Sequence, residues 1–91
     1  MKMLELLKSE LLGKELTVLE MDNIASSILE VEGEQSILNG DFIYYAFANM
    51  NHTYTTWENG NEVEYNICFE LVEENEYKQD IIIKITDIEI L

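Results

Sequence analysis

The chain has 91 residues, with 19 acidic residues against five lysines and no arginine, and its net charge at pH 7 is −14. This charge excludes direct binding to nucleic acid or to an anionic membrane surface, because proteins bind both through Lys and Arg. The single cysteine and the single histidine exclude an internal disulfide bond and a closed zinc site, so no metal or other cofactor is expected.

The composition predicts one intracellular domain that covers residues 1–91. A hydrophobic content of 47% is ordinary for a globular domain of this length. The lone cysteine, Cys68, fits a reducing compartment. The N-terminal segment carries acidic residues within its apolar pattern, unlike a secretory signal. No apolar run approaches the roughly 20 residues that span a bilayer.

The N-terminal segment predicts a helix over residues 2–12. Leu4, Leu7 and Leu11 recur at helical spacing and form one apolar stripe. Gly13 follows the stripe directly. Because glycine adopts the left-handed conformation that commonly follows a helix, the helix is expected to end there.

The segment after this helix allows two assignments. Residues 16–21 predict a short strand, and Asp22-Asn23 indicates either a turn or the start of a short helix. For residues 22–29 the sequence leaves helix and strand open. The alternation of polar and apolar side chains over residues 28–32 favours the strand.

Turn signals bound the next strands. Asn39-Gly40 precedes residues 42–48, whose apolar side chains predict a strand covered on both faces. Asn59-Gly60 is the favoured pair of a type I′ turn, and it separates residues 52–58 from residues 61–73. These two segments therefore predict a β-hairpin.

The pattern of the hairpin also predicts its register. In the second arm apolar and polar residues alternate, so one set faces a core and the other faces away from it. With a two-residue loop, the core-side pairs are Thr56–Val63, Tyr54–Tyr65 and His52–Ile67, and the outer pairs are Trp57–Glu62, Thr55–Glu64 and Thr53–Asn66.

The last third of the chain predicts an acidic connection, residues 73–79, and an isoleucine-rich strand, residues 80–91. In this strand the parity of the isoleucines changes near Thr86-Asp87, which indicates a β-bulge. Together the elements predict an α+β fold, in which the N-terminal helix packs on a mostly antiparallel β-sheet of about four to six strands.

Catalytic chemistry is not expected from this sequence. The predicted register places His52 on the core side of the hairpin and Cys68 on its outer side, so the two cannot form a nucleophile–base pair. Neither a Gly-rich phosphate loop nor an EF-hand calcium loop occurs in the chain.

The acidic surface is the feature that predicts a function. Two or three acidic segments side by side would approach the charge density of duplex DNA, one charge per about 1.7 Å of axis, and an exposed tryptophan would add an anchor. Solvation of a small domain would explain the same charge without any partner. The predicted partner-binding residues are Trp57, Glu58, Glu62, Glu64, Glu70, Glu73, Glu74 and Glu76.

In general character this short chain, which is rich in Glu and lacks arginine and proline, resembles the small acidic inhibitors of phages and mobile elements. That group includes anti-CRISPR proteins and DNA mimics. The resemblance covers the whole chain and rests on no motif. It implies a protein of the bacterial cytoplasm that inhibits a nucleic-acid-binding enzyme, a defence nuclease such as a CRISPR effector, by occupying its basic nucleic-acid groove.

Two other functions fit the same sequence. An immunity or antitoxin protein against a toxin nuclease would use the same acidic surface. A phage structural or assembly protein would instead pair strand edges through residues 80–91. The favoured reading and the antitoxin reading predict a basic protein surface as the partner, such as a nuclease, and no membrane. The chain itself is expected to be a monomer or a homodimer.

Overall fold

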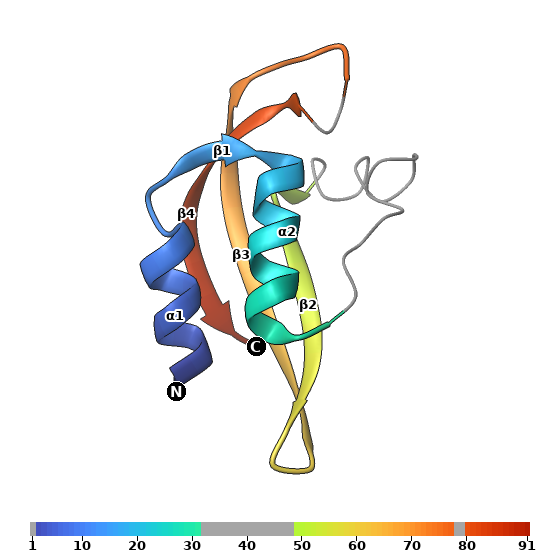
Figure 1. Cartoon of the computed structure of the whole chain (residues 1–91). Helices are drawn as coiled ribbons and strands as arrows, with labels where there is room; N and C mark the ends of the chain where they lie inside the picture. The colour runs from blue at the N-terminus through green and yellow to red at the C-terminus, as the bar shows by residue number, and fades with distance from the viewer. Residues whose placement is uncertain (1, 32–48, 78–79) are drawn as a thin grey trace.

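The computed structural model describes residues 2–31, 49–77 and 80–91 (Figure 1). The turn predicted at residues 39–40 and the strand predicted at 42–48 lie outside these residues. In chain order the described elements are α1 (Lys2–Leu11), β1 (Glu15–Thr17), α2 (Val18–Leu29), β2 (Asn51–Glu58), β3 (Asn61–Glu73) and β4 (Ile82–Ile90).

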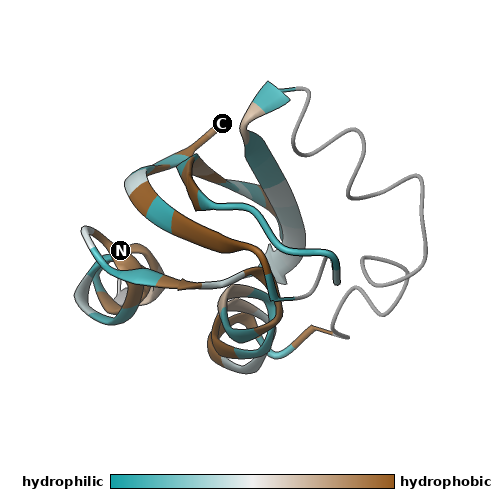
Figure 2. Cartoon of the chain, turned by 90° about the horizontal axis from the view of Figure 1, so that it is seen from above, coloured by the Kyte–Doolittle hydropathy of each residue, from teal (hydrophilic) through white to brown (hydrophobic). Residues whose placement is uncertain are grey.

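The four strands form one sheet in the order β1-β4-β3-β2, and every neighbouring pair is antiparallel. Both helices lie on the same side of this sheet (Figures 1 and 2). The α+β fold and the strand number predicted from the sequence are therefore confirmed. None of the described elements covers the opposite side of the sheet, which we call the open face.

Helix α1 forms as predicted and ends one residue earlier, at Leu11. Leu7 and Leu11 are fully buried, and Leu4 packs against the same core. Gly13 follows with a positive φ of 79°, which a residue without a Cβ adopts at little cost. The Gly13 amide donates to the carbonyl of Ile85, so the turn also ties α1 to β4.

Helix α2 corrects the prediction for residues 16–29. The strand ends at Thr17, and a helix occupies the rest of this segment. Thr17 is the N-cap of a capping box, in which its hydroxyl accepts from the Glu20 amide at 3.1 Å and the Glu20 carboxylate accepts from the Thr17 amide at 3.0 Å. These bonds satisfy two amides that a helix start leaves without partners. The buried apolar residues Val18, Met21, Ala25 and Leu29 recur at helical spacing.

The hairpin and its register are confirmed pair by pair. Strand β2 begins one residue before the predicted boundary, and all six predicted pairs are present. Asn59 and Gly60 have φ values of 52° and 79°, as a type I′ turn requires at both central positions. The hairpin therefore places Trp57 and Glu62 on the open face.

The predicted bulge in β4 is also confirmed. Cys68 pairs with Asp87, whereas the next residue of β3, Phe69, pairs with Ile85. Thr86 is thus the extra residue. Because of it, Ile85 and Ile88 both point into the core. A second irregularity, at Val72 of β3, was not predicted.

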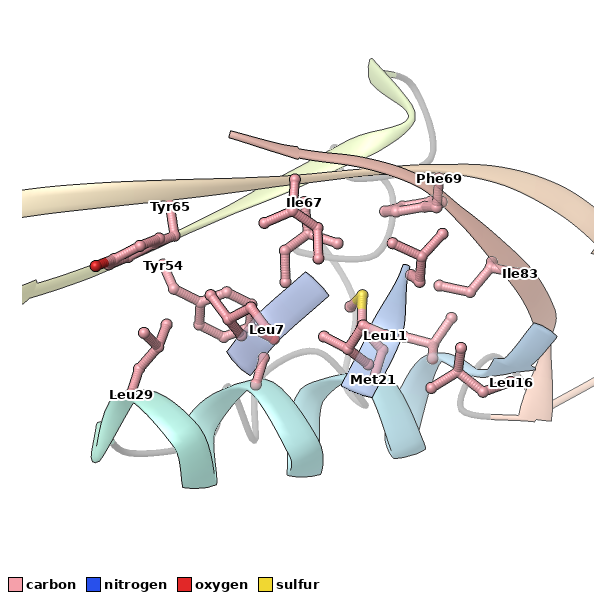
Figure 3. Close-up of a cluster of buried hydrophobic side chains, with 14 residues drawn as sticks. Leu7, Leu11, Leu16, Met21, Leu29, Tyr54, Tyr65, Ile67, Phe69 and Ile83 are labelled. Carbon is pink, nitrogen blue, oxygen red and sulfur yellow. The ribbon is translucent and has the colours of Figure 1, made fainter. Parts of the chain in front are cut away.

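The core lies between the helices and the covered face of the sheet (Figure 3). Leu7 and Leu11 of α1 and Met21 and Leu29 of α2 point toward the strands. The strands contribute Tyr54, Tyr65, Ile67, Phe69, Ile83, Ile85 and Ile88, all nearly inaccessible to solvent.

A polar contact between side chains of α2 and β2 is buried within this core. Asp22 of α2 is 3% exposed, and its Oδ1 accepts a hydrogen bond of 2.6 Å from the Tyr54 hydroxyl of β2. A buried carboxylate needs such donors to offset its lost hydration. The His52 ring packs edge-on against Tyr54 with 4.4 Å between ring centroids, on the core side as predicted.

Candidate functional site

The open face is formed by the side chains that alternate away from the helices. Its residues, assigned from the strand register, are Asn51, Thr53, Thr55 and Trp57 of β2; Glu62, Glu64, Asn66, Cys68, Glu70 and Glu73 of β3; Ile82, Lys84, Asp87 and Glu89 of β4; and Glu15 and Thr17 of β1.

Negative charge is gathered on this face. Seven of its side chains are carboxylates and one is a lysine. Helix α1, on the other side of the sheet, carries two lysines and two glutamates and is electrically balanced. The open face thus carries half of the net charge of the described residues, −6 of −12, and the carboxylates of its neighbouring strands add their potentials.

The structure brings five of the eight predicted partner-binding residues onto one surface. Glu62, Glu64 and Glu70 are exposed along the outer side of β3. Trp57 stands opposite Glu62 and is 69% exposed. A tryptophan this exposed beside carboxylates forms an anchor of the kind found at protein interfaces.

Glu58 does not join this surface. It alternates toward the helix side of the hairpin, where its Oε2 accepts a hydrogen bond from the Tyr65 hydroxyl. Burial of that hydroxyl, together with the hydrogen bond and the negative charge of Glu58, raises the pKa of Tyr65 to about 12. The contact ties the last residue of β2 to β3 and stiffens the backbone beside Trp57.

The remaining predicted residues lie at the other end of β3. Glu73 is on the open face beyond the irregularity at Val72, while Glu74 and Glu76 lie in the connection that follows and are exposed. Eleven residues of strand separate Glu62 from Glu73, or about 36 Å at 3.3 Å per residue. Apart from Glu58, the predicted residues therefore lie in two regions at opposite ends of β3, with Glu70 between them.

Three acidic residues of the open face were missed in the sequence, Glu15 of β1 and two residues of β4. Asp87 pairs with Cys68, and Glu89 pairs with Asn66, so both extend the acidic surface of β3 onto β4. The predicted bulge contained the signal, since it turns Asp87 and Glu89 to the side opposite Ile88. Alternation alone could not show that β4 lies next to β3 in the sheet.

Asn66 organises the centre of the open face. Its Oδ1 accepts from the Thr53 hydroxyl at 3.1 Å, and its Nδ2 lies 3.4 Å from Glu89 Oε1 and 3.4 Å from Cys68 Sγ. Asn66 is 7% exposed, so these contacts are shielded from water. They connect side chains of β2, β3 and β4 and hold Glu89 in place.

His52 and Cys68, the two side chains considered for catalysis, lie on opposite faces of the sheet, as the register predicted. Burial, with the nearby charges of Glu89 and Asp87, raises the pKa of the Cys68 thiol, which keeps it protonated and a weak nucleophile. Burial lowers the pKa of His52 to about 4, and the charge of Asp22 opposes this only in part.

Other kinds of site find no support among the described residues. Within them, no three His, Cys, Asp or Glu side chains are placed to share a metal ion. No described helix is long and apolar enough to cross a membrane.

The outer edge of β4 is where a structural or assembly protein would pair with another chain. Its isoleucines 83, 85 and 88 are core residues, so burial in this domain accounts for them without a second chain. Strand β1 and Lys14 pair with β4 as far as Ile85. Farther along, where no described residue pairs with this edge, Asp87 Oδ1 accepts from the Ile88 amide at 2.9 Å and obstructs an incoming strand.

Comparison with family models, curated proteins and solved structures returned no match to this chain.

Proposed function

We propose that this chain is an acidic binding protein that inhibits a nucleic-acid-binding enzyme, a defence nuclease such as a CRISPR effector, by occupying its basic nucleic-acid groove. The observation that carries the proposal is the charge of the open face, with seven carboxylates and one lysine on a surface that no described element covers. The groove of such an enzyme is lined by Lys and Arg, which the open face complements.

The density of charge on the open face limits how much of a nucleic acid it can imitate. Seven carboxylates along a molecule 41 Å long give one charge per about 6 Å, against one per about 1.7 Å in duplex DNA. The face therefore resembles a few phosphate positions and not a continuous duplex. Contacts that do not depend on charge, of which Trp57 is the most exposed, must supply part of the affinity.

Competition for the groove requires no chemistry from the inhibitor. The field of the open face steers the chain to the basic groove and raises the association rate at low salt. Once bound, the chain excludes nucleic acid because both occupy the same lysines and arginines. Binding and inhibition should both weaken as salt is raised.

Charge reversal on the open face tests the proposal. The double variant Glu62→Lys/Glu64→Lys and the control Glu5→Lys/Glu10→Lys change the net charge equally, but the control residues are exposed on α1. Each protein is used to capture partners from a bacterial lysate, and the captured protein is then assayed for binding to DNA and RNA. We expect wild type and control to retain a nucleic-acid-binding protein that the open-face variant loses.

Displacement is the decisive measurement. Nucleic acid added to the captured complex should release the chain, because the two compete for one groove. Simultaneous binding of nucleic acid and chain, or equal retention by the open-face variant, contradicts the proposal. A captured toxin in place of a defence enzyme selects the immunity reading of the same surface.

A further inference from the structure

The hairpin end of the open face combines an exposed aromatic ring with two carboxylates. Trp57 is the single tryptophan of the chain and is 69% exposed. Glu62 lies directly opposite it across the hairpin, and Glu64 lies one pair farther along the same side of β3. The core accounts for the other alternating set of side chains on these strands, but it gives no reason for an indole here.

The hydrogen-bond pattern brings these side chains together. The Phe69 amide donates to the Met50 carbonyl at 3.0 Å, and pairs that exchange hydrogen bonds alternate from there toward the turn. The pair Trp57–Glu62 is therefore of the type without hydrogen bonds, with Cα atoms about 4.5 Å apart and side chains in close approach. Glu64 lies diagonally within about 8 Å of the Trp57 side chain's origin.

Two contacts fasten the backbone beneath this group. The type I′ turn at Asn59-Gly60 closes the hairpin, and the Tyr65–Glu58 hydrogen bond fastens the residue next to Trp57 from the opposite face. Ordering these residues when a partner binds therefore costs little entropy, which is the advantage of a preorganised surface.

We propose that Trp57, Glu62 and Glu64 form a docking surface for an arginine side chain of the partner. The inference rests on the proposed function and specifies the chemistry of the contact. A guanidinium is planar, so it can stack on the indole while its N–H groups pair with a carboxylate in the same complex. A lysine ammonium is a compact and strongly hydrated charge, which makes no such stack.

Two synthetic peptides, hexa-arginine and hexa-lysine, serve as probes because they carry equal charge. Each is titrated into the intact chain at about 0.15 M salt, and the fluorescence of Trp57 reports contact at this position without a label. We expect hexa-arginine to change the Trp57 emission and to bind about two- to fivefold more tightly than hexa-lysine, because only the planar guanidinium can stack on the indole and pair with a carboxylate at the same time.

Two variants separate the indole from the general charge. Trp57→Leu should remove the preference for arginine, measured by calorimetry, while both peptides still bind. The control is Tyr77→Leu, because Tyr77 is also exposed among carboxylates but follows the far end of β3. This control should keep the preference at its wild-type value.

Equal affinity for the two peptides overturns the inference, as does a preference that survives Trp57→Leu or an unchanged Trp57 emission on binding hexa-arginine. These results are distinct from failure of the proposed function. Loss of target capture by Glu62→Lys/Glu64→Lys without any arginine preference leaves the proposed function intact and removes only this inference. An arginine preference together with target capture that Glu62→Lys/Glu64→Lys does not affect leaves this inference intact and contradicts the proposed function.

Discussion

The two faces of the sheet use the same strands for different purposes. Along β3, Tyr65, Ile67 and Phe69 point into the core and are at most 4% exposed, while Glu64 and Glu70 point to the open side. A substitution on the covered face should therefore change stability, and one on the open face should change binding. The difference teaches that alternation with a period of two residues can separate folding from recognition within a single strand.

The largest effect on stability is expected on the covered face. Ile67→Ala removes a fully buried side chain and should lower the free energy of unfolding by about 2–5 kcal/mol, as such truncations do in well-packed cores. Urea denaturation followed by circular dichroism measures it. A loss below about 1 kcal/mol would mean that the covered face is not packed as described.

A pH effect of similar size is expected from His52, also on the covered face. Its pKa falls from 6.5 in the unfolded chain to about 4 in the folded protein because of burial. The unfolded state thus binds more protons between these values, so this contribution is complete above pH 6.5 and is lost as the pH falls to about 4, by roughly 3 kcal/mol.

Nuclear magnetic resonance can follow this titration directly, because His52 is the only histidine. The imidazole resonances should stay at their neutral positions down to about pH 5. Titration near pH 6.5 in the folded protein would show instead that water reaches the ring.

A smaller effect tests the element that the sequence analysis misassigned. Thr17→Ala removes the hydroxyl of the capping box and should lower the free energy of unfolding by about 1 kcal/mol. Thr17→Ser retains the hydroxyl and serves as the matched control, with a loss near zero. Equal losses in both variants would assign the effect to packing of the methyl group.

The smallest effect on stability belongs to the open face. Glu62→Lys/Glu64→Lys leaves the core untouched and should change the free energy of unfolding by no more than about 0.5 kcal/mol, even as it abolishes capture of a partner. The same denaturation experiment measures it. A loss of several kcal/mol in the free energy of unfolding would show that the open face also stabilises the fold, and would contradict the distinction between the two faces.

Features that depend on residues close in sequence were predicted well. Asn59-Gly60 and the alternation after it determine the hairpin register, and the change of parity around Thr86 reveals the bulge. Residues 18–21 were wrongly assigned to a strand, and residues 22–29 were left open between helix and strand, because the local capping signal, Thr17 followed three residues later by Glu20, was overlooked.

The candidate site was predicted only in part, for two reasons. Glu58 was grouped with the acidic surface, although the parity of β2 already turned it to the side of Tyr65. Glu89 was overlooked because its place beside Asn66 depends on which strands are neighbours, a choice that core packing makes between segments distant in sequence. The charge was visible in the composition, whereas the share of it that lies on the open face needed the tertiary structure.

The Asp87–Ile88 contact has a consequence for how the protein behaves in acid. Near the isoelectric point of about 4.1, mutual repulsion between molecules disappears, and the bond from the Ile88 amide to Asp87 Oδ1 is what still blocks this strand edge. We expect Asp87→Ala, which removes that bond, to associate near the isoelectric point more strongly than the wild type, seen as turbidity.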